Sequence, residues 1–209
     1  MKYSLFFTMA VVASLLLPRS VDARIGERRE SFERRLFSNG GIIYRDKEER
    51  KTRRSSGPYT QYLQYLGNSA EVRVYFKSDD GRQPTQSDLD KGTLGSGWEV
   101  HVLFVGGKSV LETYKRVGSM SEYEMNALLA VLGGGAYWEE AEPPVEDELE
   151  KDEPPPSAFG FDYVRSDGEV RAKKSGGGLM VFQKQLDEFL AKQHEGNLIQ
   201  SAPQSVQGF

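Results

Sequence analysis

The sequence predicts an α+β protein in which antiparallel β-hairpins pack against short amphipathic helices. Residues 98–117 form two β-rich runs around Gly106-Gly107, and adjacent glycines can take the positive φ angles of a two-residue hairpin turn. A second hairpin is predicted to turn at Asp167-Gly168. Helical patterns lie between and beyond these hairpins, and hairpins covered by helices are typical of the α+β class.

Helices are predicted where apolar residues recur at helical spacing. Ser121 and Glu124 have the spacing of a capping box, which predicts a helix over residues 121–132. Two earlier helices are predicted at residues 30–37 and 58–66. Residues 179–182 are either a further strand or the start of the last helix. The apolar stripe of that last helix consists of Phe182, Leu186, Phe189 and Leu190.

Strands are predicted where apolar and polar residues alternate, at residues 42–44 and 71–77 and in both hairpins. A two-residue turn in the first hairpin places His101 opposite Glu112, on a mixed face that also carries Glu99. The other face of this hairpin is apolar. We therefore expect the sheet to be covered by helices on one side.

The first 23 residues indicate a secretory signal peptide. Lys2 supplies a positive start, residues 5–17 are mostly apolar, and Val21-Asp22-Ala23 suits a signal peptidase that cuts after Ala23. The apolar run is short for a bilayer span, so no stable transmembrane segment is expected after cleavage. An uncleaved signal anchor is the alternative. The predicted location is periplasmic or secreted.

Charge and cysteine content narrow the class of protein. The chain has a formal net charge of −4 and no cysteine. The missing cysteine excludes disulfides and thiolate metal sites, and it favours a bacterial periplasm. Residues 24–57 carry 11 Lys/Arg against 6 Asp/Glu, whereas residues 139–153 carry 9 acidic residues and one lysine. A mildly acidic chain argues against nucleic-acid binding, because that requires a net basic face.

These patterns divide the chain into segments. The segment before residue 58 is charged and partly flexible, and the acidic one is a proline-rich linker. The C-terminal hairpin and helix belong either to the same domain or to a small separate lobe. The predicted segments are a signal peptide (1–23), the charged segment (24–57), an α+β core (58–138), the acidic linker (139–157), the hairpin with its helix (158–194) and a disordered tail (195–209).

His101 and Glu112 are the one suggestive acid/base pair, because opposed side chains on neighbouring strands can share a hydrogen bond. Glu99 and Tyr114 are expected on the same face. The hairpin has no serine in a nucleophile motif, so these residues are weak catalytic candidates. A cross-strand charge pair on the surface is the simpler interpretation.

Other motifs point to no cofactor or metal. The chain has two histidines, His101 and His194, without zinc-site spacing. The acidic residues 139–153 lack the pattern of a calcium loop. In residues 173–178 the lysines and serine precede the glycines, which is the reverse of a phosphate-binding loop and indicates a flexible turn.

The sequence therefore predicts an exported protein of the bacterial envelope that acts as a non-catalytic binding or structural module. Its expected partner is an envelope protein or polymer. Two alternatives remain open: a small periplasmic hydrolase that uses His101 with nearby carboxylates, and a signal-anchored protein at the membrane surface.

Overall fold

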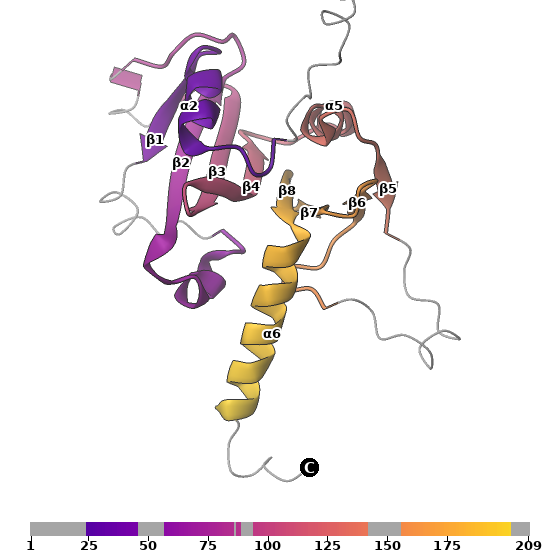
Figure 1. The fold of residues 1–209 in the computed structure, drawn as a ribbon. Helices are drawn as coiled ribbons and strands as arrows, with labels where there is room; N and C mark the ends of the chain where they lie inside the picture. The colour runs from indigo at the N-terminus through magenta and orange to yellow at the C-terminus, as the bar shows by residue number, and fades with distance from the viewer. Residues whose placement is uncertain (1–23, 46–56, 86, 89–93, 142–155, 202–209) are drawn as a thin grey trace, which may run out of the picture.

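A computed structural model describes residues 24–45, 57–85, 87–88, 94–141 and 156–201. These residues form one antiparallel sheet of eight strands, with helices on both of its faces (Figure 1). The α+β fold with hairpins packed against short helices is thereby confirmed. The predicted signal peptide, most of the acidic linker and the last eight residues lie outside the described ranges.

The strands are β1 (Gly41–Arg45), β2 (Ala70–Ser78), β3 (Gly97–Val105), β4 (Lys108–Arg116), β5 (Trp138–Glu140), β6 (Tyr163–Arg165), β7 (Val170–Ser175) and β8 (Gly178–Gln183). The α-helices are α2 (Arg29–Phe37), α5 (Glu122–Gly133) and α6 (Lys184–Gln200). Two short 3₁₀ helices are η1 (Thr60–Tyr65) and η2 (Gly67–Ser69).

The sheet consists of two antiparallel meanders joined edge to edge. Its strand order is β1-β2-β3-β4-β8-β7-β6-β5, so the two halves of the chain meet where β4 pairs with β8. Strands β6, β7 and β8 from the C-terminal part of the chain thus lie in the same sheet as the strands of the core. Within the described residues, no helix is long and apolar enough to cross a membrane.

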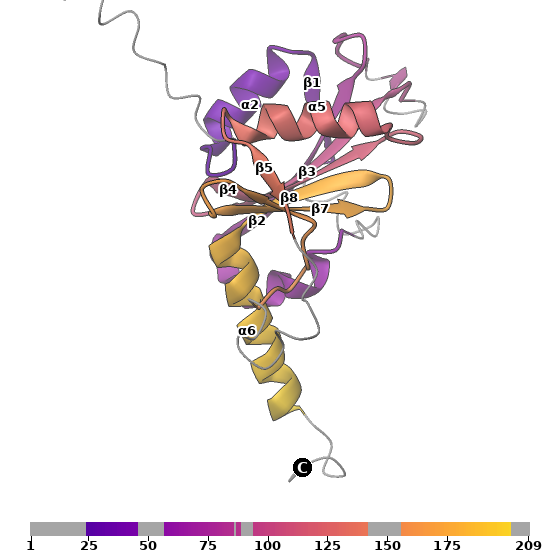
Figure 2. The same cartoon turned by 90° about the vertical axis from the view of Figure 1, so that its right-hand side faces the viewer.

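Both faces of the sheet are covered, so the expectation of helices on one side is wrong. α2 and α5 cover one face, and η1 and α6 cover the other (Figure 2). The reason is that the mixed face also buries large apolar residues: Leu103, Leu111 and Phe182 are almost fully buried there. We call these the α5 face and the α6 face.

The first hairpin turns at Gly106-Gly107 as predicted, with φ angles of 58° and 76°. Its predicted register is wrong. Phe104 pairs with Ser109 but Leu103 pairs with Leu111, so Val110 is an extra residue that forms a β-bulge. Beyond this bulge every pair shifts by one residue.

The helices follow the sequence with three differences. The capping box of Ser121 and Glu124 is present at the start of α5. The predicted helix at residues 58–66 is the 3₁₀ helix η1, a form common in short helical turns. Residues 179–182 lie in strand β8, and α6 continues to Gln200, past the residue where the disordered tail was predicted to begin.

Candidate functional site

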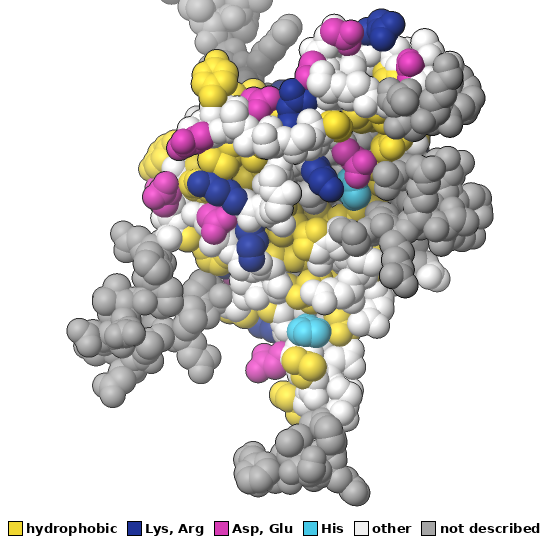
Figure 3. Space-filling model, turned by 180° about the vertical axis from the view of Figure 1, so that it is seen from behind, with side chains coloured by type: hydrophobic (Ala, Val, Ile, Leu, Met, Phe, Trp, Pro, Cys, Tyr) yellow, Lys and Arg dark blue, Asp and Glu magenta, His cyan; other side chains and the backbone are white. Residues whose placement is uncertain are grey.

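His101 lies on β3, on the α6 face, in a short chain of polar side chains. The Tyr59 hydroxyl, at the start of η1, is 2.6 Å from His101 Nδ1. Glu99 Oε1 is 2.6 Å from His101 Nε2. Figure 3, which shows the molecule from behind the view of Figure 1, shows two histidine side chains (cyan), the upper one next to acidic side chains (magenta). The structure therefore brings His101 and Glu99 together, as the sequence suggested.

The partners fix the proton on the imidazole ring. An ionised carboxylate only accepts hydrogen bonds, so His101 Nε2 donates to Glu99. In the neutral ring, Nδ1 then accepts from the Tyr59 hydroxyl. His101 is 8% exposed and Tyr59 is 2% exposed. Because both ring nitrogens bind protein groups in a nearly closed site, this geometry favours a structural role over that of a general base.

Glu112 is not part of this chain of side chains. The bulge at Val110 pairs His101 with Thr113 in place of Glu112, which turns Glu112 to the α5 face. Glu99 and Tyr114 are likewise on opposite faces, since Tyr114 pairs with Val100. The predicted proximity of His101 and Glu112 is therefore wrong, because no residue pattern in the hairpin indicated the bulge.

Glu112 instead forms a buried polar site under the α5 face. It is 0% exposed, and the Tyr114 hydroxyl donates a hydrogen bond to its Oε2. Burial raises the pKa of Glu112 to about 7, although Tyr114, Ser109 and the charge of Arg35 act to lower it. A carboxyl group with this pKa changes its protonation near neutral pH.

A groove between α5 and the chain that leads into β5 was not predicted from the sequence. It has a volume of about 480 Å³. Tyr137 on its rim is 67% exposed, and Trp138 donates from its indole nitrogen to the Leu129 carbonyl at 2.8 Å. The lining residues are Asn126, Leu129, Ala130, Gly135, Ala136, Tyr137, Trp138, Glu140 and Tyr163. The sequence signal that could have pointed to this groove is the adjacent aromatic pair Tyr137-Trp138.

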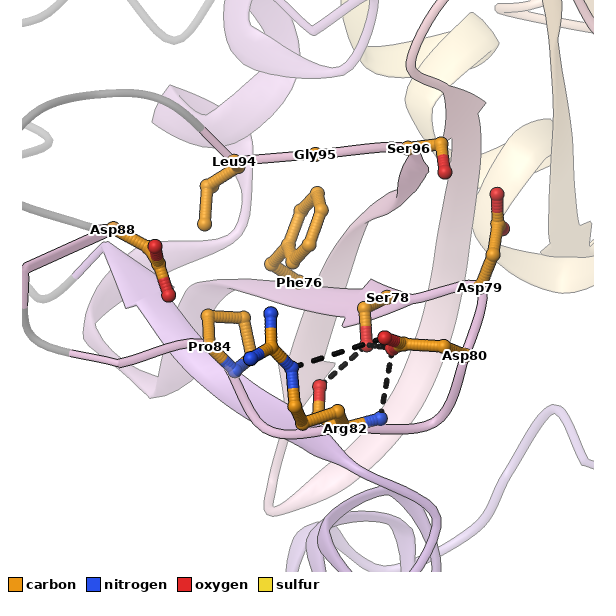
Figure 4. Close-up of a pocket in the computed structure, with 10 residues that line it drawn as sticks. All are labelled: Phe76, Ser78, Asp79, Asp80, Arg82, Pro84, Asp88, Leu94, Gly95 and Ser96. Atoms are coloured by element: carbon orange, nitrogen blue, oxygen red, sulfur yellow. Dashed lines mark hydrogen bonds and ion pairs between the residues drawn. The ribbon is translucent and has the colours of Figure 1, made fainter.

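A second, more polar pocket of about 290 Å³ lies at the loop between β2 and β3 (Figure 4). Asp80 accepts from the Arg82 backbone N–H at 2.9 Å and from the Ser78 hydroxyl at 2.8 Å. These hydrogen bonds, that of Arg82 foremost, lower the pKa of Asp80. Asp79 instead pairs with Arg116 at 2.7 Å. Asp80 thus stabilises the loop, whereas Asp79 connects the loop to β4.

The two histidines and the glycine-rich segment 173–178 lie in separate elements of the fold. Across the described part of the chain, no group of three or more His, Asp or Glu is placed to hold a metal ion. Gly176 and Gly177 form the turn between β7 and β8, with φ angles of 51° and 81°. The turn in segment 173–178 is thus limited to these two glycines, and the rest of the segment lies in β7 and β8.

Comparison of the chain with known protein families, with curated proteins and with solved structures finds no match. The class of protein rests on the fold and on the groove alone: an eight-stranded antiparallel sheet with helices on both faces and an aromatic groove beside α5.

Proposed function

We propose that this chain is an exported protein of the bacterial envelope that works by binding a segment of a partner protein. The groove beside α5 carries this proposal. Its apolar floor and exposed Tyr137 resemble the composition of protein interfaces, where tyrosine and tryptophan supply large contact areas.

Two features of the groove support a protein partner. Tyr123, Asn126 and Ala130 are spaced along one face of α5, and Tyr123 is 82% exposed. This places a second exposed tyrosine on the helix face that lines the groove. On the other side is β5, the terminal strand of the sheet, and a terminal strand can pair with an extended peptide.

The buried position of His101 supports binding over catalysis. A general base must reach the substrate proton directly or through one water molecule. His101 instead holds Tyr59 and Glu99 within the α6 face. The predicted signal peptide supports export, which would bring the groove into contact with envelope proteins.

Affinity capture from envelope extract tests the groove. Residues 24–209 serve as bait at low and at high salt, beside a Tyr137→Ala variant. A Leu198→Ala variant is the matched control, because Leu198 is also exposed but lies on α6. We expect the wild-type bait and the Leu198→Ala control to capture the same protein, and this capture to persist at high salt. The Tyr137→Ala bait should not capture that protein.

Three outcomes would overturn the proposal. Equal capture by Tyr137→Ala would mean that the partner binds outside the groove. Capture that is lost at high salt would mean that only non-specific charge attraction holds the partner. Sedimentation with peptidoglycan that depends on Tyr137 would make a polymer the partner in place of a protein. Export is tested separately: protein recovered from cells should begin at Arg24, whereas an intact Met1 would support the signal-anchored alternative.

A further inference from the structure

We propose that the buried carboxylate of Glu112 is the binding site for the α-ammonium group that cleavage after Ala23 creates on Arg24. This inference rests on the export in the proposed function. It assigns to Glu112 a role that the sequence did not suggest: a sensor of the processed N-terminus.

The chain just after the predicted cleavage point is fixed along the start of β4. The Gly26 N–H donates to the Ser109 carbonyl at 2.8 Å, and the Ser109 N–H donates to the Glu27 carbonyl at 2.9 Å. Arg28 forms a β-bridge with Lys108, and the Ile25 side chain is buried in the core of the α5 face. Residues 25–28 therefore hold Arg24 at a defined place.

That place adjoins Glu112. The Ser109 hydroxyl donates to the Arg24 carbonyl at 3.3 Å, and Ser109 also lies close enough to Glu112 to lower its pKa. The bulge at Val110 brings Ser109 and Glu112 onto the same face of β4. Standard bond lengths keep the Arg24 nitrogen within about 3.6 Å of its own carbonyl oxygen. These distances place the Arg24 nitrogen within about 7 Å of the Ser109 hydroxyl, on the side of β4 that carries Glu112. From there the new amino group would turn toward the carboxylate.

The carboxylate has an unused acceptor. Tyr114 donates to Oε2, but among the described residues no hydrogen-bond donor reaches Oε1, which is fully buried. A buried acceptor without a partner is costly, so such atoms usually mark a missing ligand or water. An ammonium group offers three donors and a positive charge.

Two arginine side chains, Arg35 and Arg24, already act on Glu112 electrostatically. Arg35 on α2 is paired with Glu27 at 2.6 Å. The Arg24 guanidinium is half-buried, and burial lowers its pKa. On β4 itself, Tyr114 acts only as a hydrogen-bond donor. A free α-amino group has a pKa near about 8, so at neutral pH it carries the charge that would hold Glu112 ionised.

Cleavage would then stabilise the fold. While the peptide bond to Ala23 is intact, Glu112 is a buried carboxyl whose pKa is about 7. Once the ammonium group forms, the same carboxylate belongs to a buried ion pair, and its pKa falls. The protein would reach full stability only after its signal peptide is removed.

Two recombinant proteins with defined N-termini test this. All described elements lie within residues 24–201, so residues 24–209 contain the whole described fold. One protein begins at Arg24, and the other carries Val21–Ala23 in front of it. At pH 7.5 we expect the extension to lower the Tm by about 4 °C or more. In a Glu112→Gln background we expect the extension to have no effect.

Two controls make the result specific. Glu30→Gln removes an exposed carboxylate from α2 and should leave the effect of the extension intact. Carbon NMR titration of Glu112 in the wild-type sequence needs no substitution: its pKa should lie near 7 in the extended protein and be clearly lower in the protein that begins at Arg24.

Equal Glu112 pKa values in the two proteins, or an extension effect that persists in Glu112→Gln, would overturn the inference. Both measurements use purified protein and do not depend on export. A failure here therefore leaves the groove and the export proposal standing, whereas an intact Met1 in cells would remove the biological trigger without changing the NMR result.

Discussion

Two hydrogen bonds of 2.6 Å join His101 to Tyr59 and Glu99 in a nearly closed site. Breaking either bond should lower the stability of the fold measurably. Tyr59→Phe removes the hydroxyl and leaves His101 Nδ1 without that partner. We expect a loss of about 1–3 kcal/mol in the free energy of unfolding, measured with urea. Tyr137→Phe, at an exposed tyrosine, should change it little. An unchanged Tyr59→Phe protein would contradict the structural role.

Glu112 makes stability depend on pH in the protein whose peptide bond to Ala23 is intact. Its pKa is about 7 in the folded state and about 4.3 in an unfolded chain. Between these values the folded state binds more protons, so its stability falls as the pH rises. We expect the free energy of unfolding of this uncleaved protein to fall by about 3 kcal/mol between pH 4 and pH 8. The Glu112→Gln variant with the same N-terminus should not show this fall. Parallel denaturation curves would contradict this.

Asp187 on α6 holds the chain that returns from the acidic segment. It is 0% exposed and accepts hydrogen bonds from Ala158 N–H at 2.9 Å and from Arg171 at 2.6 Å. Asp187→Asn leaves the buried Arg171 without its closest counter-charge. We expect a loss of about 3–5 kcal/mol in chemical denaturation.

The matched control for Asp187 is Glu188→Gln. Glu188 also pairs with Arg171, at 3.1 Å, but its side chain is 28% exposed. A pair that reaches solvent contributes little, so this substitution should cost under about 1 kcal/mol. Similar losses in the two variants would show that the carboxylates are equivalent and that the burial of Asp187 does not matter.

At the level of elements, the features that depend on a few neighbouring residues could be predicted from the sequence. Capping at Ser121 and the turn at Gly106-Gly107 both depend on a few adjacent residues, and both are confirmed. The bulge at Val110 depends on which residues fill the two faces of the sheet, so it could not be predicted from the hairpin alone. For the same reason His101 and Glu112 were expected together, although they lie on opposite faces.

The groove beside α5 also escaped prediction, because its walls come from distant parts of the chain. Ala130 lies on α5, Trp138 on β5 and Tyr163 on β6. No spacing in the sequence links these residues. Their proximity follows from the pairing of β5 with β6, which brings the two sides of the acidic segment together.

The capping box of α5 gives a prediction at this scale. The Glu124 N–H donates to the Ser121 hydroxyl oxygen, while the Ser121 N–H donates to the Glu124 carboxylate at 2.9 Å. Ser121→Ala removes one of these partners and should cost about 1 kcal/mol in thermal or chemical unfolding. Ser119→Ala, just before the helix, should cost less. Equal costs would show that the cap contributes nothing specific.

At the level of the whole molecule, the pairing of β4 with β8 decides whether the chain is one folding unit or two. Leu179 and Val181 of β8 are fully buried on the α5 face, and Met180 and Phe182 are almost fully buried on the α6 face. A chain that ends at residue 141 would expose the edge of β4 from Leu111 to Lys115 and would lack the apolar side chains that β8 adds to both faces of the sheet.

We therefore expect residues 24–141 alone to lack a cooperative unfolding transition, because the loss of β8 removes apolar partners from both cores at once. Residues 156–209, supplied as a separate chain, should restore the transition, since the two halves are joined mainly through strand pairing and packing. Circular dichroism melts of each half and of their mixture measure this. A cooperative transition in residues 24–141 alone would mean that the first meander is an independent domain and that β8 only extends it.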